Sequence, residues 1–217
     1  MSGGLSPRSE PPPGWTGCPC GLSGIGISWI GSAEEWLATY RPRPGRSPSP
    51  RRSSLSAVMV REYQESDRSW AEPFMRDEFG GPYQARRGQL VDVLALPGFV
   101  AEESGRPVGL VTYRRENNEC ELAFIGTLER HRGIGTALLE AVLEAVAGCD
   151  RIWLVTTNDN LEALRFYQRR GFVLSALRPG AVDAARRRLK PQISGTGEFG
   201  IPLRDELELE FRPTTVR

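Results

Sequence analysis

The sequence is poor in the residues from which metal sites, catalytic triads and disulfide frameworks are built. Of its 217 residues only one is a histidine, His131, and four are cysteines. Cys18 and Cys20 form a Cys-Pro-Cys tripeptide, which is not a zinc-type pair, and Cys120 and Cys149 stand alone in apolar surroundings. This composition disfavours a histidine-rich metal site, a Ser-His-Asp triad and a disulfide-stabilised fold. We expect no metal and four reduced thiols.

An excess of one charge sign and long apolar runs are also missing. The chain has 28 Lys and Arg against 27 Asp and Glu, a formal net charge of +1. This balance argues against electrostatic binding to nucleic acid or to an anionic membrane. The sequence contains no run of 18 apolar residues that could span a bilayer. It also lacks the charged segment followed by an apolar segment that is typical of a secretory signal. We predict a cytoplasmic protein without nucleic-acid or membrane partners.

Composition divides the chain into two parts. Pro, Gly and Ser make up about half of residues 1–57. Such a segment has too few apolar groups to offset the loss of chain entropy on folding. Residues 41–54 are rich in Pro and Arg, which is typical of an extended linker. We therefore predict a disordered tail over 1–57 and one folded domain over 58–217. One hypothesis makes Met59 the natural start, because ordered patterning begins at Val58.

Residues 58–217 alternate between strand and helix patterns. Ile134 to Val146 carries an apolar stripe at helical spacing that ends at Gly148, and residues 90–96 fit either a strand or a helix. The predicted strands are 58–62, a meander of 99–102, 108–114 and 120–125, and then 151–156, 172–177 and 207–211. The other predicted helices are 71–79, 160–170 and 181–189. The pattern predicts an α/β domain with a mixed sheet flanked by helices.

A glycine-containing loop, Arg130–Thr136, precedes the strongest helix. Gly133 and Gly135 allow the backbone to approach a ligand closely, and the first turn of the helix offers free N–H groups. With Arg130 and Arg132 this favours a phosphate or pyrophosphate site. The spacing fits neither a Rossmann fingerprint nor a Walker loop. A plain strand-to-helix turn remains the alternative.

A second motif spans residues 160–172. Seven helical steps of about 100° separate Asn160 from Tyr167, about 20° short of two full turns, so both side chains lie on one face. Ala163 between them permits a close approach to a ligand or a strand. Tyr167 alone would also fit a core aromatic whose hydroxyl is satisfied.

Together the two motifs resemble the GNAT superfamily of acetyl-CoA-dependent N-acetyltransferases. Arg130, Gly133 and Gly135 match its Arg/Gln-x-x-Gly-x-Gly/Ala loop, and residues 160–172 match its Asn-x-x-Ala-x-x-Phe-Tyr-x-x-x-Gly-Phe signature. The resemblance covers about 58–212 and implies a mostly antiparallel sheet whose strands 120–125 and 151–156 splay apart around acetyl-CoA. The cosubstrate contacts it implies are Ile125, Thr127, Arg130, His131, Arg132, Gly133, Ile134, Gly135, Thr136 and Asn160. His131 stands where the family often has Gly, and Thr127 where a Pro is common.

The resemblance also implies direct transfer to an amine, without an acyl-enzyme on Cys120 or Cys149. Tyr167 would act as the general acid toward the leaving thiolate. Glu119 and Glu121, two apart on one strand, share a face and are the candidate bases. We prefer Glu121, acting through water, although either carboxylate would also fit a solvated strand position.

The sequence leaves several alternatives for the acceptor of the acetyl group. We favour a small-molecule amine over a protein N terminus or lysine, and a non-catalytic acyl-CoA-binding module remains a third reading. Residues 67–87 and 179–205 should set specificity. Acids and aromatics in 67–87 suit a cationic, partly apolar amine or, equally, an ordinary amphipathic helix. We expect a monomer or homodimer.

Overall fold

The computed structural model describes residues 58–129 and 132–213. The tail predicted to be disordered, residues 1–57, lies outside the described residues, as do Arg130 and His131. Within the described ranges, no helix has the length and apolar character needed to cross a bilayer.

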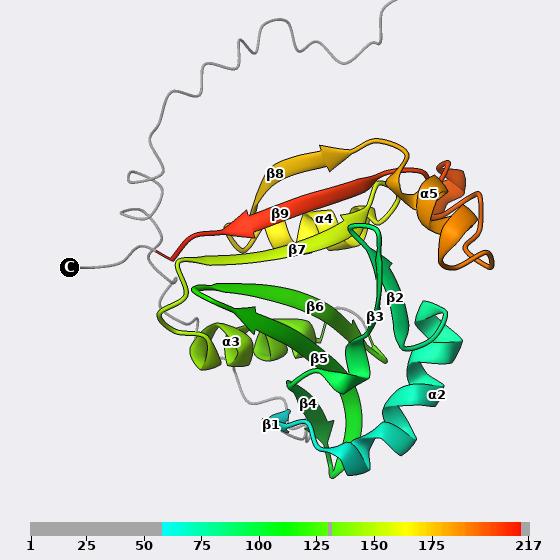
Figure 1. Ribbon diagram of the computed structural model, residues 1–217. Coiled ribbons are helices and arrows are strands. Elements are labelled where there is room, and N and C mark those ends of the chain that lie inside the picture. Colours follow the sequence, from blue (N-terminus) through cyan, green and yellow to red (C-terminus); the bar gives the residue numbers. More distant parts are fainter. Residues whose placement is uncertain (1–57, 130–131, 214–217) are drawn as a thin grey trace, which may run out of the picture. The chain divides into compact units, whose positions relative to one another are not determined.

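Seven strands form one sheet in the order β1-β4-β5-β6-β7-β9-β8 (Figure 1). All neighbours are antiparallel except β6 and β7, so the predicted mixed, mostly antiparallel sheet is confirmed. The strands are β1 (Met59–Glu62), β4 (Gly98–Glu103), β5 (Arg106–Glu116), β6 (Glu119–Thr127), β7 (Arg151–Thr157), β8 (Val173–Arg178) and β9 (Glu206–Phe211). A separate hairpin consists of β2 (Tyr83–Arg86) and β3 (Gln89–Asp92).

Helices cover the two faces of the sheet through two apolar clusters. On one face, α3 (Ile134–Ala145) and α4 (Leu161–Gln168) pack through a cluster that includes Leu138, Val142 and Ile152. On the other, α2 (Arg68–Phe79) joins a second cluster of buried apolar residues. The remaining helices are α5 (Ala181–Arg188) and the 3-10 turns η1 (Glu65–Asp67), η2 (Val93–Ala95) and η3 (Glu198–Gly200). The predicted helices are therefore confirmed.

The strands β6 and β7 run together only at their beginnings. Their parallel pairing covers Glu119–Glu121 of β6 and Arg151–Trp153 of β7, and they then diverge toward their carboxyl ends (Figure 1). A bulge at Ala123 lies just past the last pair, because Tyr113 pairs with Leu122 while Thr112 pairs with Phe124. A bulge bends a strand and interrupts its pairing. The splay predicted for these two strands is confirmed.

The hairpin of β2 and β3 is the main element that the sequence patterns did not predict. Arg86 pairs with Gln89, so Arg87 and Gly88 make a two-residue turn with φ values of 47° and 74°. Residues 90–96, which fit either a strand or a helix, contribute the end of β3 and the turn η2. In Figure 1 the tip of the hairpin reaches the carboxyl-terminal part of β7.

Candidate active site

The site lies where β6 separates from β7. Beyond Glu121, no described strand pairs with the edge of β6 that faces β7. On its other edge, Ile125 pairs with Val111 and Thr127 pairs with Gly109 of β5. The predicted contacts Ile125 and Thr127 thus lie on a stretch of strand whose free main-chain groups can bind an extended ligand.

The start of α3 lies beyond the end of this strand. Gly133 caps the helix with φ +81°, and its carbonyl accepts hydrogen bonds from the N–H groups of Thr136 and Ala137, both at 3.0 Å. The N–H groups of Ile134 and Gly135 precede these and have no acceptor within the helix, at the positive end of its dipole. These amides are the groups that the predicted anion site would use.

Arg132 points its guanidinium at carboxylates. It contacts Glu103 at 2.6 Å and Glu129 at 2.9 Å, and these ion pairs raise its pKa above the usual value. The predicted contribution of Arg132 to anion binding would require it to exchange one of these partners. Arg130 and His131 lie outside the described residues.

Close packing joins the start of α3 to α4. A Cβ on Gly135 would lie 3.3 Å from Phe166, so the small residue permits the contact between the two helices. The Thr136 hydroxyl accepts a hydrogen bond from Arg170, whose guanidinium lies 3.7 Å from the centre of the Phe166 ring. Gly135 therefore has a packing role in addition to its predicted place in the anion site.

The second motif lies on α4 as the sequence predicted. Asn160 is the N-cap, and its Oδ1 accepts a hydrogen bond from the N–H of Ala163 at 3.1 Å. Its amide nitrogen keeps its two donors, because no hydrogen bond joins it to the described residues. Tyr167 is only 5 % exposed and packs between Phe166 and Phe172. Burial raises the pKa of Tyr167 well above its usual value, and the guanidiniums of Arg86 and Arg170 partly oppose this shift.

Glu121 and Arg86 meet at the point of separation. Glu121 is 3 % exposed and is held by Arg86 at 3.1 Å and Arg114 at 2.7 Å. Arg86 also donates to the carbonyl of Ala123 at the bulge, and its buried Nε has no partner among the described residues. Arg86 could not be predicted, because 35 residues separate it from Glu121 and no local sequence pattern marks it.

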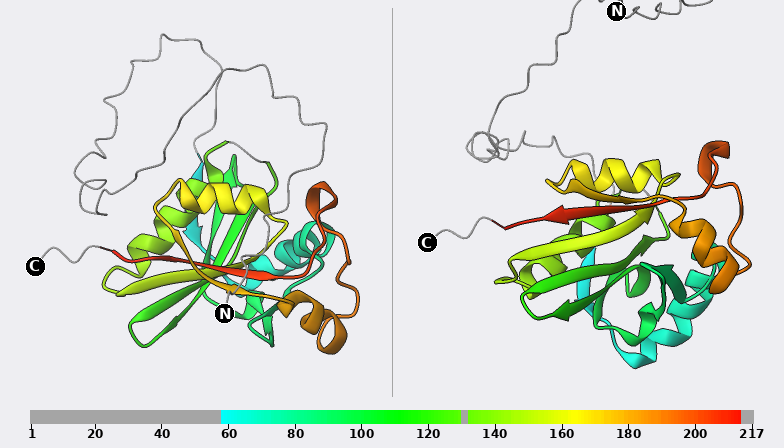
Figure 2. Two further views of the ribbon diagram at one scale, coloured as in Figure 1. Left: turned by 90° about the horizontal axis from the view of Figure 1, so that it is seen from above. Right: turned by 45° about the horizontal axis from the view of Figure 1, so that its top comes forward.

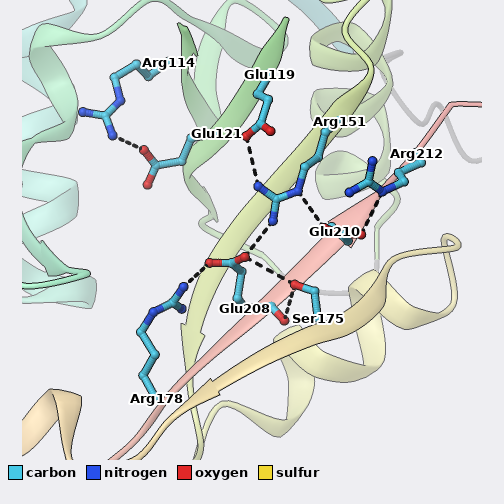
Figure 3. A network of polar contacts seen from close by, with 9 residues as sticks. All are labelled: Arg114, Glu119, Glu121, Arg151, Ser175, Arg178, Glu208, Glu210 and Arg212. Carbon is cyan, nitrogen blue, oxygen red and sulfur yellow. Dashed lines mark hydrogen bonds and ion pairs between the residues drawn. The ribbon is translucent and has the colours of Figure 1, made fainter. Parts of the chain in front are cut away.

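Glu119 belongs to a different group of charges (Figure 3). It is about half exposed and pairs with Arg151 at 3.0 Å. Arg151 also contacts Glu208 at 2.7 Å and Glu210 at 2.6 Å on β9. Glu119 and Glu121 share one face of β6, as predicted, and Glu121 lies nearer the separation because it forms the last pair with β7.

Two hollows adjoin the hairpin tip, and Arg87 lines both. The Glu121 hollow has a volume of about 500 Å³ and is lined by Arg87, Arg114, Glu116, Asn117, Asn118, Glu119, Glu121, Asp150, Arg151, Trp153 and Arg212. The Glu206 hollow has about 430 Å³ and is lined by Arg87, Gly88, Arg178, Ala181, Ala184, Ala185, Arg188, Leu189 and Glu206. Burial raises the pKa of Glu206, a residue that no sequence motif marked.

The two segments predicted to set specificity lie against each other. Lys190 donates to the carbonyl of Tyr83 at 2.9 Å, and this contact joins the loop after α5 to β2. The aromatic side chains of α2 are largely used in packing, since Trp70 stacks on Phe74 and Phe79 packs edge-on against Phe124. Of the two interpretations of α2, the ordinary amphipathic helix accounts for these contacts.

Comparison with known proteins identifies this arrangement. Residues 58–172 match the model of the acetyltransferase (GNAT) family. The protein YdhI of Bacillus subtilis is 42 % identical over 137 residues, which cover 62 % of this chain and 85 % of YdhI. The IAA acetyltransferase of Bacillus cereus shares the fold at 18 % identity with a TM-score of 0.56, covering 72 % of this chain and 100 % of its own. Naa50 of Arabidopsis thaliana, whose structure was solved with the bisubstrate analogue CoA-Ac-MVNAL, shares the fold at 18 % sequence identity with a TM-score of 0.52. The match covers 72 % of this chain and 99 % of Naa50. The chain belongs to the GNAT family and is an N-acetyltransferase.

Proposed function

We propose that the protein transfers an acetyl group from acetyl-CoA directly to the amine of a small molecule. The observation that carries the proposal is the unpaired edge of β6, which runs toward the amides at the start of α3. Tyr167 lies on the α4 side of the separated strands, and Glu121 lies on the side of the hairpin. An extended thioester and an amine could therefore reach the separation from opposite faces.

The proposed cosubstrate site fits the chemistry of each part of acetyl-CoA. Main-chain groups of β6 would pair with the amide-containing arm, and the amide nitrogen of Asn160 would donate to it. The start of α3 would bind the pyrophosphate. The proposed contacts remain Ile125, Thr127, Arg130, His131, Arg132, Gly133, Ile134, Gly135, Thr136 and Asn160.

Glu121 is the proposed base. An amine with a pKa near ~10 is mostly protonated at neutral pH and must lose a proton before it attacks the thioester. Arg86 and Arg114 engage the carboxylate of Glu121, so it would act through a water molecule or after exchanging one contact. Glu119 is the second candidate, and its pairing with Arg151 places it farther from the separation.

Tyr167 is proposed to stabilise the leaving thiolate. Because burial raises the pKa of Tyr167, while a free thiol titrates near ~8.5, complete proton transfer to the thiolate is uphill. The phenol therefore acts by donating a strong hydrogen bond. Burial also raises the pKa of Cys120 to about 12, which disfavours a thiolate acyl carrier.

The hollows favour a small acceptor over a protein. Volumes of about 430 and 500 Å³ fall within the range of ~300–1,000 Å³ that is usual for small-molecule sites. Arg87 at the hairpin tip lines both hollows, and Leu189, which follows α5, lines the Glu206 hollow. The buried free thiols of Cys120 and Cys149 support a location in the reducing cytoplasm.

The test combines acetyl-CoA binding with CoA release in the presence of a panel of amines. We expect acceptor-dependent release of CoA and an N-acetylated product detected by mass spectrometry. Binding of acetyl-CoA without release by any amine would contradict the proposal. Release by peptides alone would favour a protein acceptor.

A further inference from the structure

We infer that the acceptor carries a carboxylate in addition to its amine, and that Arg87 at the hairpin tip binds this carboxylate. The inference rests on the proposed function and names the substrate class of the same site. It predicts a small amino acid or a similar amine with an acidic group.

The backbone at Arg87 is held in an uncommon conformation. Arg87 and Gly88 both have positive φ, and such two-residue turns favour Asn, Asp or Gly at the first position. The N–H of Arg87 donates to both carboxylate oxygens of Glu206, at 3.2 and 3.1 Å, which holds the turn in place. A strained residue that its surroundings hold in place is a feature of ligand-binding sites.

The side chain of Arg87 is exposed and has no acidic partner. Its guanidinium lies 4.9 Å from the centre of the Trp153 ring. No carboxylate among the described residues forms an ion pair with it, although Arg114 and Arg151 nearby are both paired. A guanidinium stacked on an indole is oriented, and its N–H donors remain available to a ligand.

The Glu206 hollow has an excess of positive charge. Three guanidiniums line it, from Arg87, Arg178 and Arg188, and Glu206 is its one acidic residue. Arg188 is exposed and forms no ion pair within the described ranges. Arg178 pairs with Glu208, but its buried Nη1 has no hydrogen-bond partner there. Such a set of donors matches the two oxygens of a carboxylate.

The position of Arg87 connects the Glu206 hollow with the proposed chemistry. Arg87 also lines the Glu121 hollow, and the preceding residue, Arg86, contacts Glu121 directly. A carboxylate bound at Arg87 would therefore direct the attached amine toward Glu121. A neutral amide or a simple alkylamine lacks the group that would make this contact.

The test compares amino acids with their carboxamides as acceptors. We expect the wild-type enzyme to prefer the acid by about 10- to 100-fold in kcat/KM, because one charged hydrogen-bonded contact has that effect. Arg87→Asn should reduce the preference to within about threefold, since Asn-Gly suits the turn and the guanidinium is lost. Arg106→Gln is the matched control, because Arg106 is exposed at the start of β5, outside the segments predicted to set specificity, and its loss should leave the preference unchanged.

Equal use of acid and amide by the wild-type enzyme, or an unchanged preference in Arg87→Asn, would overturn the inference. If no variant acetylates either compound while acetyl-CoA binds, the proposed function fails separately. Calorimetry with the amino acid then decides the binding site. Weaker binding to Arg87→Asn than to Arg106→Gln supports it, and equal binding overturns it.

Discussion

Replacing Tyr167 with phenylalanine isolates the contribution of one hydroxyl group. The ring packs against Phe166 and Phe172, with centroid distances of 5.1 and 5.4 Å, and phenylalanine keeps these contacts. The hydroxyl forms no hydrogen bond with the described residues, so its loss breaks no contact within the protein. We expect the free energy of unfolding to change by less than about 1 kcal/mol.

The expected effect on turnover follows from the proposed hydrogen bond to the thiolate. A hydrogen bond to a charged group contributes about 1.5–3 kcal/mol, and about 1.4 kcal/mol corresponds to a factor of ten. Tyr167→Phe should therefore lower kcat by about 10- to 150-fold. The KM for acetyl-CoA should change little, because the contact strengthens only as the thiolate forms.

The assay is steady-state CoA release at several pH values, with Tyr63→Phe as the matched control. The Tyr63 hydroxyl is buried and has no partner among the described residues, but Tyr63 directly follows β1, outside the proposed site. Because burial raises the pKa of Tyr167, its phenol stays protonated and the ratio of wild-type to variant kcat should be constant from about pH 6 to 9. A kcat within twofold of wild type, or an equal loss in Tyr63→Phe, would refute the proposed role.

Two further predictions concern stability. Asp67→Asn should lower the free energy of unfolding at pH 7 by about 1–2 kcal/mol, after allowance for solvent screening of Arg61. Arg61 holds the pKa of Asp67 below its usual value, so the wild-type advantage should be lost as pH falls below about 4; equal differences in urea melts at pH 3 and 7 would contradict this. Arg86→Met should cost about 3 kcal/mol, because buried Glu121 loses one of two guanidiniums. Adding Glu121→Leu should recover part of that loss in urea melts, and a further additive loss would count against the pairing.

The elements that could be predicted are those in which one buried face gives the sequence a periodic pattern of apolar residues. The stripe of Ile134, Leu138 and Val142 is buried in α3, and the left-handed Gly80 and Gly171 follow α2 and α4. The hairpin at 83–92 carried no comparable signal, because its strands are short and its turn is not a favoured pair. Its turn is bonded instead to Glu206, 119 residues away in sequence.

The candidate site was predictable to the extent that its residues share an element. Asn160 and Tyr167 lie on one helix, so helical spacing was sufficient to relate them. Glu206 was not predictable for a topological reason. The Glu-Leu alternation of β9 fits a strand with one solvated face, but β9 lies between β7 and β8 rather than at the edge. Its acids therefore face arginines from neighbouring elements, as Glu208 does with Arg151 and Arg178 (Figure 3).

Arginine–glutamate ion pairs occupy an open face of the sheet. Within the described ranges, no helix packs over the face of β6, β7 and β9 where Arg151 bridges three glutamates, as the second view in Figure 2 also shows. Arginines in such networks are held by their partners, and substituting them should mainly lower stability. Arg87 and Arg188 form no ion pair within residues 58–129 and 132–213. Because no such partner is lost, substituting them should mainly change acceptor use. An Arg87 variant that loses stability but keeps its acceptor preference would contradict this division of roles.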